Sequence, residues 1–189
     1  MTGFRLETGR LVVRDWEDGD VAPFLRVTNT PAVMRYLGGV MDDAKADAAM
    51  ARLASYASNF GFNLWILERK ADGGHLSGEM LGFCGLKRAN IEPGPQGDIE
   101  IGWRLREDSW GHGYATESAR AVLAHAFEGL AAPHVIAITV PENKPSQQVM
   151  RRIGMTPRPD LDFAPESKWA PDERLVVFAI TREQWESQA

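Results

Sequence analysis

The sequence predicts a single domain of the α/β (α+β) class, with a mixed and mostly antiparallel central sheet flanked by helices. Three runs with strand character follow one another with turn residues between them, which is typical of an antiparallel meander. Later, a helical pattern separates two further strand-like runs, which is the order of a parallel crossover. The chain has 189 residues and no linker divides it. We therefore expect one domain over residues 1–189, with its core at about 7–181.

The first part of the chain predicts one strand and two helices. Residues 10–15 have β-branched side chains at their centre and predict a strand. Helical spacing follows over 20–29, and a turn that starts with a proline covers 31–37. Asp42 or Asp43 suits the N-cap of a second helix, which we expect to end at Gly61.

The remaining elements follow from changes in the hydrophobic period. The meander strands are predicted over 63–69, 79–87 and 98–106, and a long helix with one apolar stripe over 113–130. After it we expect a strand over 134–140, a helix over 144–153 that Gly154 ends, a loop over 156–172 and a last strand over 174–180.

The composition excludes several classes of protein. Lys and Arg number 21 against 26 Asp and Glu, a formal charge of −5 that argues against nucleic-acid and polybasic membrane partners. Cys84 is the single cysteine, which rules out an intramolecular disulfide and a thiolate metal cluster. The histidines show no ligand spacing, so we expect no metal. The start of the chain has no apolar run typical of a secretory signal, which favours a cytoplasmic location.

The most informative stretch is Asp-Ser-Trp-Gly-His-Gly-Tyr-Ala-Thr-Glu over 108–117. A predicted strand leads into a turn with Gly111 and Gly113, and the long helix starts there. Glycine amides and a helix N-terminus together favour phosphate, although a turn that merely needs positive φ fits equally well. Thr116 stands where a dinucleotide fingerprint needs a third Gly or Ala, and no Gly-Lys-Ser/Thr triplet makes a P-loop.

The run IGWRLREDSWGHGYATESA, followed by PENKPSQQVMRRIGM, resembles the GNAT (GCN5-related N-acetyltransferase) superfamily, in its branch of ribosomal-protein N-terminal acetyltransferases. The similar order of elements extends over 7–181. The resemblance implies the GNAT fold with a splayed pair of strands and acetyl-CoA as cosubstrate. It also implies direct acetyl transfer, in a ternary complex, to a primary amine of a protein N-terminus or a small molecule. It does not decide whether the chain forms a homodimer.

The resemblance also implies the residues that bind acetyl-CoA. Backbone amides of the glycine turn would hold the pyrophosphate, the preceding strand would line the pantetheine arm and polarise the thioester, and Asn143 would contact the arm while it caps its helix. These residues are Trp103, Leu105, Arg106, Gly111, His112, Gly113, Tyr114, Ala115, Thr116 and Asn143. We expect His112 to have no catalytic role and Glu117 to face away from the phosphate.

Two residues are candidates for catalysis. Glu100 matches the position of a family glutamate that deprotonates the substrate ammonium, because only the neutral amine attacks a thioester. The alternative is an ordinary solvent-facing residue on a half-buried strand. Many relatives have a tyrosine acid where this chain has Met150, which cannot donate a proton. Ser146 is the candidate substitute, or a surface serine bonded to the backbone, and a thiol of pKa about 8.5 leaves without obligatory acid help.

The resemblance implies an acceptor site shaped by 16–39 and 156–172, where Glu17, Asp18 and Asp20 could attract an amine. Two other functions stay open. One is an enzyme of the same fold that uses another acyl-CoA. The other is a non-catalytic acyl-CoA-binding module, which the missing tyrosine suggests.

Overall fold

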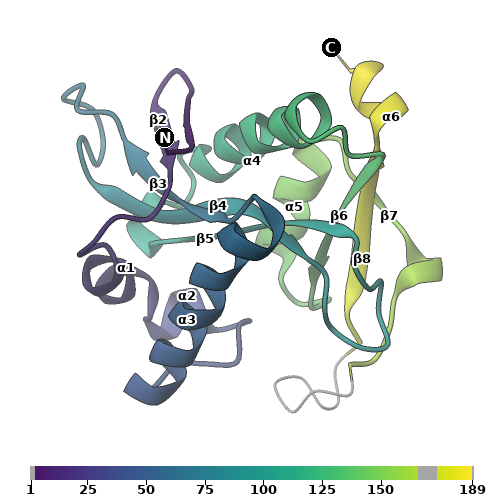
Figure 1. Cartoon of the computed structure of the whole chain (residues 1–189), viewed down its shortest axis with the longest axis horizontal. Helices are drawn as coiled ribbons and strands as arrows, with labels where there is room; N and C mark the ends of the chain where they lie inside the picture. The colour runs from purple at the N-terminus through teal and green to yellow at the C-terminus, as the bar shows by residue number, and fades with distance from the viewer. Residues whose placement is uncertain (1–2, 166–173, 189) are drawn as a thin grey trace.

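The computed structural model describes residues 3–165 and 174–188, and its centre is an eight-stranded sheet with the order β1-β2-β3-β4-β5-β6-β8-β7 (Figure 1). The strands are β1 (Arg5–Glu7), β2 (Leu11–Arg14), β3 (Leu64–Arg69), β4 (Met80–Arg88), β5 (Ile99–Leu105), β6 (His134–Thr139), β7 (Thr156–Pro157) and β8 (Val176–Thr181). The predicted meander is β3, β4 and β5, and each of these strands begins and ends within one residue of the predicted bounds.

The sheet is mixed, as predicted, because β5 and β6 are parallel whereas the other neighbouring strands are antiparallel. The β5–β6 pairing is short: Glu100 pairs with Ile136, and no further pair forms between these strands along their described lengths. The strands then diverge toward their carboxyl ends. The predicted splayed pair is therefore β5 and β6, and Glu100 lies where they begin to separate.

The helices cover both faces of the sheet. In Figure 1, α1, α2 and α3 lie below it, and α4 lies above it. The main helices are α1 (Val21–Thr28), α2 (Pro31–Met34), α3 (Asp43–Phe60), α4 (Tyr114–Ala124), α5 (Lys144–Arg152) and α6 (Arg182–Glu186). Two 3-10 turns cover Glu107–Ser109 and Pro159–Leu161. Within the described part of the chain, no helix has the length and apolar character needed to cross a bilayer.

The local signals for the two longest helices are confirmed. The Asp42 side chain accepts a hydrogen bond from Lys45 N at 2.8 Å, and Gly61 ends α3 in the left-handed conformation with φ 75°. The predicted helix over 113–130 is α4 followed by a π-helical turn over His125–Gly129. Its apolar stripe is buried: Ala119, Val122 and Leu123 pack on the sheet.

The sequence analysis missed β1, β7 and α6, which have 3, 2 and 5 residues and are too short to establish a period. The last strand begins at Val176, two residues after the predicted start, since Arg174 precedes any strand pairing. Residues 166–172 of the predicted loop lie outside the described residues.

Alternation along β5 sends its side chains to opposite sides of the sheet. Ile101 and Leu105 join the core under α4, as predicted. Glu100, Gly102 and Arg104 point to the other side, toward α1 and α3. The apolar side chains on that side are Phe24, Leu53, Tyr56, Leu64, Ile66 and Phe83.

Candidate active site

A cavity of about 850 Å³ opens where β5 and β6 diverge. Glu100, Gly102, Trp103 and Arg104 of β5 form one wall, and Thr139 of β6 lies opposite. The helical walls come from α2, α3 and α5; their lining residues are Met34, Ala49, Arg52, Leu53, Tyr56, Ser146 and Met150. The cavity therefore joins the splayed strands to the helices on the far side of the sheet.

Glu100 lines this cavity and is only 6% exposed. It lies opposite Lys87 in the antiparallel β4–β5 register, and the two side chains form an ion pair. Burial raises the pKa of the Glu100 carboxyl, although the positive charge and hydrogen bond of Lys87 act in the opposite direction. The alternative of a solvent-facing residue on a half-buried strand is wrong for Glu100.

The backbone amides of β5 point alternately toward β4 and toward β6. Arg106 N donates to Leu81 O at 2.8 Å, so this amide is directed at β4. Hydrogen-bonded pairs alternate along an antiparallel ladder, which directs the Trp103 and Leu105 amides toward β6 and the splayed space. In agreement, Leu105 O faces away from β4 and accepts a bond from Trp110 Nε1 at 3.1 Å.

The three predicted β5 contacts consequently differ. Trp103 lines the cavity, and its ring also packs against the core on the α4 side of the sheet. The Leu105 side chain is in that core, and only its backbone faces the splayed space. The Arg106 amide differs from those of Trp103 and Leu105, because it is bonded to β4 and is not free to polarise a thioester. The Arg106 guanidinium also binds the carboxylates of Asp108 at 2.6 Å and Glu79 at 3.2 Å.

The first turn of α5 brings Asn143 and Ser146 to the cavity. Asn143 is the N-cap, as predicted: its Oδ1 accepts from Ser146 N at 3.3 Å, and its Nδ2 donates to Thr139 Oγ1 at 3.0 Å. Within the described chain the Ser146 hydroxyl makes no hydrogen bond, so it is not bonded back to its helix. Met150 is buried one turn later and brings no proton donor.

The glycine turn is built as an anion cradle. Gly111 and Gly113 are left-handed, with φ 79° and 81°, and Gly113 is the N-cap of α4. The first N–H groups of α4, from Tyr114 to Thr116, have no partner within the helix. A second cavity of about 750 Å³ adjoins them and is lined by Gly113, Thr116 and the cationic residues Arg10, Arg120 and Arg152. Free amides and arginines fit the phosphates of coenzyme A.

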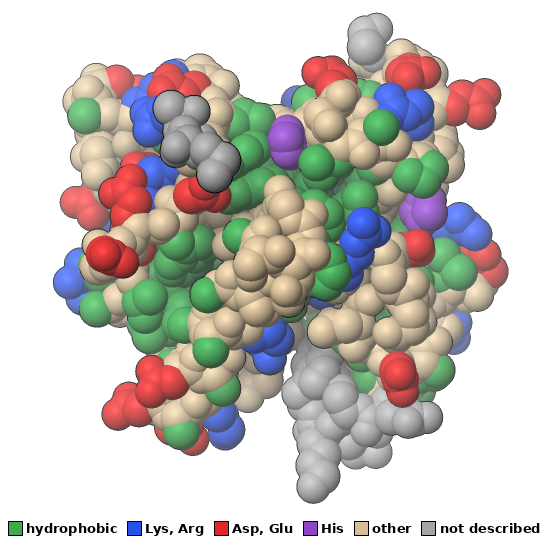
Figure 2. Space-filling view, in the orientation of Figure 1, with side chains coloured by type: hydrophobic (Ala, Val, Ile, Leu, Met, Phe, Trp, Pro, Cys, Tyr) green, Lys and Arg blue, Asp and Glu red, His purple; other side chains and the backbone are tan. Residues whose placement is uncertain are grey.

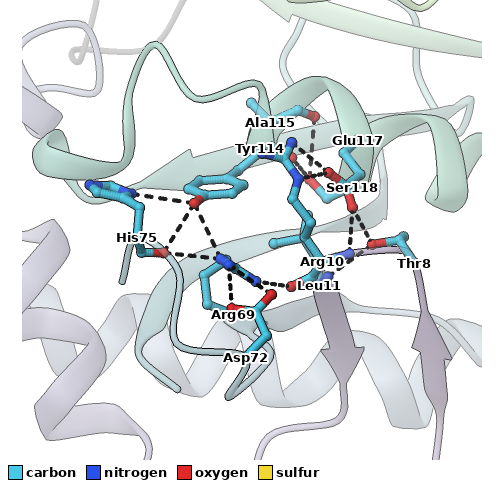
Figure 3. A network of polar contacts seen from close by, with 10 residues as sticks. All are labelled: Thr8, Arg10, Leu11, Arg69, Asp72, His75, Tyr114, Ala115, Glu117 and Ser118. Atoms are coloured by element: carbon cyan, nitrogen blue, oxygen red, sulfur yellow. Dashed lines mark hydrogen bonds and ion pairs between the residues drawn. The ribbon is translucent and has the colours of Figure 1, made fainter. Parts of the chain in front are cut away.

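The side chains of the turn anchor it to the protein (Figure 3). Tyr114 is buried, and its hydroxyl donates to His75 O at 3.1 Å and accepts from Arg69 Nε at 3.2 Å. The His112 ring stacks on His75 at 3.7 Å between centroids. Both side chains are thus engaged by the loop after β3, which leaves the backbone of the turn to meet a ligand.

Glu117 is bonded to Thr8 and Arg10 (Figure 3), and it lines the second cavity together with Gly113 and Thr116. Its Oε1 accepts from Thr8 Oγ1 at 2.6 Å, and its Oε2 pairs with Arg10 Nη2 at 2.7 Å. Burial acts against the charged form, but these bonds hold the pKa of Glu117 below its ordinary value. The carboxylate therefore stays ionised in the lining of the second cavity, where its bonds to Thr8 and Arg10 occupy both oxygens.

Arg52, Tyr56, Lys87 and Arg104 are among the cavity residues that were not singled out from the sequence. For Arg104 a signal existed, since it shares a strand face with Glu100. The other three depend on strand register and on where α3 crosses the sheet. Glu17, Asp18 and Asp20 do not line the cavity; Asp20 pairs with Arg14 at 2.7 Å. The expectation that these carboxylates attract the amine is therefore not supported.

Comparison with known proteins agrees with this arrangement. The family model described as an acetyltransferase (GNAT) domain matches residues 10–156. The uncharacterized protein YkkB of Bacillus subtilis is 36% identical over 152 residues, which cover 80% of this chain and 84% of that protein. The FsC-acetyl coenzyme A-N(2)-transacetylase of Aspergillus fumigatus is 32% identical over 131 residues, which cover 66% of this chain and 52% of that protein.

Solved structures agree as well. A crystal structure of an acetyltransferase from Agrobacterium tumefaciens superposes with a TM-score of 0.76 and 27% sequence identity, and the match covers 95% of each chain. These matches do not separate the branch of ribosomal-protein N-terminal acetyltransferases from others. The family model, the fold and the glycine turn agree, and the chain belongs to the GNAT family of acetyltransferases, for which acetyl-CoA is the acetyl donor.

Proposed function

We propose that this chain transfers the acetyl group of acetyl-CoA directly to a primary amine, with Glu100 as the base. The observation that carries the proposal is the position of Glu100: a buried carboxylate in a cavity at the point where β5 and β6 separate. The name of the Aspergillus relative, an acetyl coenzyme A-N(2)-transacetylase, supports transfer to nitrogen. Acetyl-CoA supplies an activated thioester, and the protein supplies orientation and proton transfer.

Each group of residues has a proposed part. The amides from Gly111 to Ala115 and the hydroxyl of Thr116 bind the pyrophosphate, while Asn143 and Trp103 border the pantetheine arm. The Trp103 and Leu105 amides, directed at the splayed space, polarise the thioester oxygen. Glu100 takes a proton from the ammonium, directly or through water, because burial raises the pKa of its carboxyl and so makes the carboxylate a stronger base.

The acid for the leaving thiolate is Ser146, whose hydroxyl is in the cavity and has no hydrogen bond within the described chain. One observation favours another function, a non-catalytic acyl-CoA-binding module. Met150 stands at the position where relatives are expected to have a tyrosine acid, and its thioether cannot donate a proton to the thiolate. Release of free coenzyme A upon addition of an amine separates the two functions. Peptide N-termini belong in the panel of acceptors, because the resemblance to the ribosomal-protein branch predicts them. A second series of assays with other acyl-CoA donors tests whether acetyl is the group that the chain transfers.

The test of the mechanism is Glu100→Gln. We expect kcat/KM to fall by about 100-fold or more, with the affinity for coenzyme A unchanged. The wild type should lose activity as pH falls through the raised pKa of Glu100, because protonation removes the base, and the variant should lack this limb. Glu68→Gln removes another ion-paired carboxylate on a neighbouring strand, outside the cavity lining, and serves as the control. A Glu100→Gln variant with the wild-type pH profile would exclude Glu100 as the base.

A further inference from the structure

Arg104 is a buried cation that the protein itself does not neutralise. It is 8% exposed, and it lines the cavity on the same face of β5 as Glu100. Its Nη1 contacts Met34 Sδ at 3.2 Å, a weak acceptor, and its Cζ lies 4.7 Å and 5.0 Å from the ring centroids of Phe24 and Phe83. In the described part of the chain, Arg104 Nε is the one buried side-chain nitrogen or oxygen without a hydrogen-bond partner.

The other well-buried arginines show how this protein normally compensates such a charge. Arg69 pairs with Asp72 at 2.8 Å and also donates to the carbonyl oxygens of Arg10 and His75. Arg14 pairs with Asp20 and with Glu68. Among the described residues, no carboxylate lies within ion-pair distance of Arg104.

Leaving a guanidinium without an anion costs stability, because burial removes its hydration. Burial and the positive charge of Arg52 lower the pKa of Arg104 to about 10, so it still carries its charge at neutral pH. An uncompensated charge that persists in a substrate cavity is typical of a group whose partner arrives with the ligand.

The rest of the cavity favours an anionic partner. Arg52 adds positive charge to its lining, while Lys87 and Glu100 neutralise one another. The two carboxylates there are Glu100, which is already paired with Lys87, and Glu92, which is exposed. A polyamine would therefore meet repulsion, whereas an oxyanion next to Arg104 would gain a charge-assisted hydrogen bond.

We propose that the amine acceptor also carries an oxyanion, a carboxylate or a phosphate, which the Arg104 guanidinium binds while the amine lies at Glu100. This inference rests on the proposed function. The two residues are four positions apart on β5, which places their Cα atoms roughly 13 Å apart. Their side chains shorten that span, so the acceptor is a small molecule with its amine and its anion separated by several bonds.

The experiment compares acceptors that differ only in the anion. Ethylamine, β-alanine and O-phosphoethanolamine share an aminoethyl group. Ethylamine carries no anion, β-alanine carries a carboxylate, and O-phosphoethanolamine carries a phosphate. Hexylamine and 6-aminohexanoate form a longer pair, and spermidine tests the polycation. For each, the initial rate of coenzyme A release gives kcat and KM. We expect at least one anionic acceptor to exceed its matched plain amine in kcat/KM by roughly 10- to 100-fold, and spermidine to be poor.

Two variants connect this preference to Arg104. Arg104→Met should raise KM for the preferred anionic acceptor by roughly 10- to 100-fold more than it raises KM for the matched plain amine. Arg104→Lys keeps the positive charge but lacks the planar guanidinium, so its KM for the anionic acceptor should lie between those of the wild type and Arg104→Met. Arg88→Met is the matched control: Arg88 also lies over an aromatic ring, Phe62 at 5.4 Å, and it is outside the cavity lining. Circular dichroism checks that the variants fold.

A binding measurement keeps the two proposals separable. In the presence of coenzyme A, the preferred anionic acceptor should raise the melting temperature of the wild type and of Arg88→Met, but not of Arg104→Met. Acetylation of plain and anionic amines with equal kcat/KM, or an unchanged preference in Arg104→Met, would overturn the anion site and leave the proposed function intact. If no amine is acetylated, but an anionic amine of the series still raises the melting temperature of the wild type and not of Arg104→Met, the anion site stands and the proposed acetyl transfer is overturned.

Discussion

The glycine turn at Gly111–Thr116 and the cavity at Glu100 adjoin opposite ends of β5, and different parts of the chain build them. The turn is one continuous segment that presents backbone amides at the start of α4. The cavity is lined by side chains from α2, α3, β5, β6 and α5, which are far apart in the sequence. A basic patch is absent from the face drawn in Figure 2, where acidic, basic and hydrophobic side chains are interspersed.

This difference separates two kinds of recognition. If the backbone amides of the turn bind the diphosphate as proposed, a change at the turn should weaken the binding of acetyl-CoA and lower the rate with all acceptors equally. Side chains in the cavity contact the acceptor and the reacting groups, so changes there should alter acceptor choice or pH dependence and leave coenzyme A binding unchanged. Substitutions in the two regions test that division, together with those at Glu100 and Arg104.

The largest effect is expected for Gly113→Asp. The new carboxylate would lie against the pyrophosphate, and the left-handed φ of 81° disfavours any side chain. We expect coenzyme A affinity to fall by about 100-fold or more, measured by isothermal titration calorimetry.

Gly97→Asp is the matched control, because Gly97 has φ 79°, a Cβ added there would meet open space, and the residue lies away from both cavities. This variant has the same backbone strain without the charge near phosphate and should bind coenzyme A like the wild type. Normal affinity in Gly113→Asp would mean that the turn does not hold the diphosphate.

An intermediate effect is expected for Lys87→Met. Lys87 opposes the effect of burial on Glu100, so its loss should raise the pKa of that carboxyl further. The base form then requires a higher pH: the acidic limb of kcat/KM should move to higher pH, and activity at neutral pH should fall roughly tenfold. Lys87→Arg keeps the charge and should keep the limb near its original position. A limb that does not move in Lys87→Met would show that another group controls it.

The smallest effect is expected for Ser146→Ala. The α5 cap uses the backbone N–H of Ser146, which alanine retains, so the helix should be unaffected. A coenzyme A thiolate leaves readily because the pKa of a thiol is about 8.5, and kcat should therefore change by less than about threefold. A loss of about 100-fold in kcat, with coenzyme A affinity unchanged, would make Ser146 an essential acid.

Several features could be predicted from the sequence because their causes are local. Asp42 and Gly61 bound α3, since a cap and a left-handed glycine act on adjacent residues. The glycine turn, the Asn143 cap and the side of β5 that carries Glu100 follow from short-range pattern in the same way. The short strands β1 and β7 were missed because they depend on pairing with β2 and β8. The five-residue helix α6 was missed although Thr181 and Gln184 form a capping box at its start, because one turn is too short to establish a helical period.

The sequence by itself determined the order of the longer strands and helices, the glycine turn at the start of α4 and the presence of a carboxylate near the start of β5. Only the tertiary structure decided that Glu100 is paired with Lys87, that Arg106 is bonded to β4 and that Arg104 is buried without an anion. The physical reason is the distance along the sequence over which the interactions act. Backbone conformation follows from neighbouring residues, whereas the charge state and partners of a buried side chain depend on which distant segments fold against it.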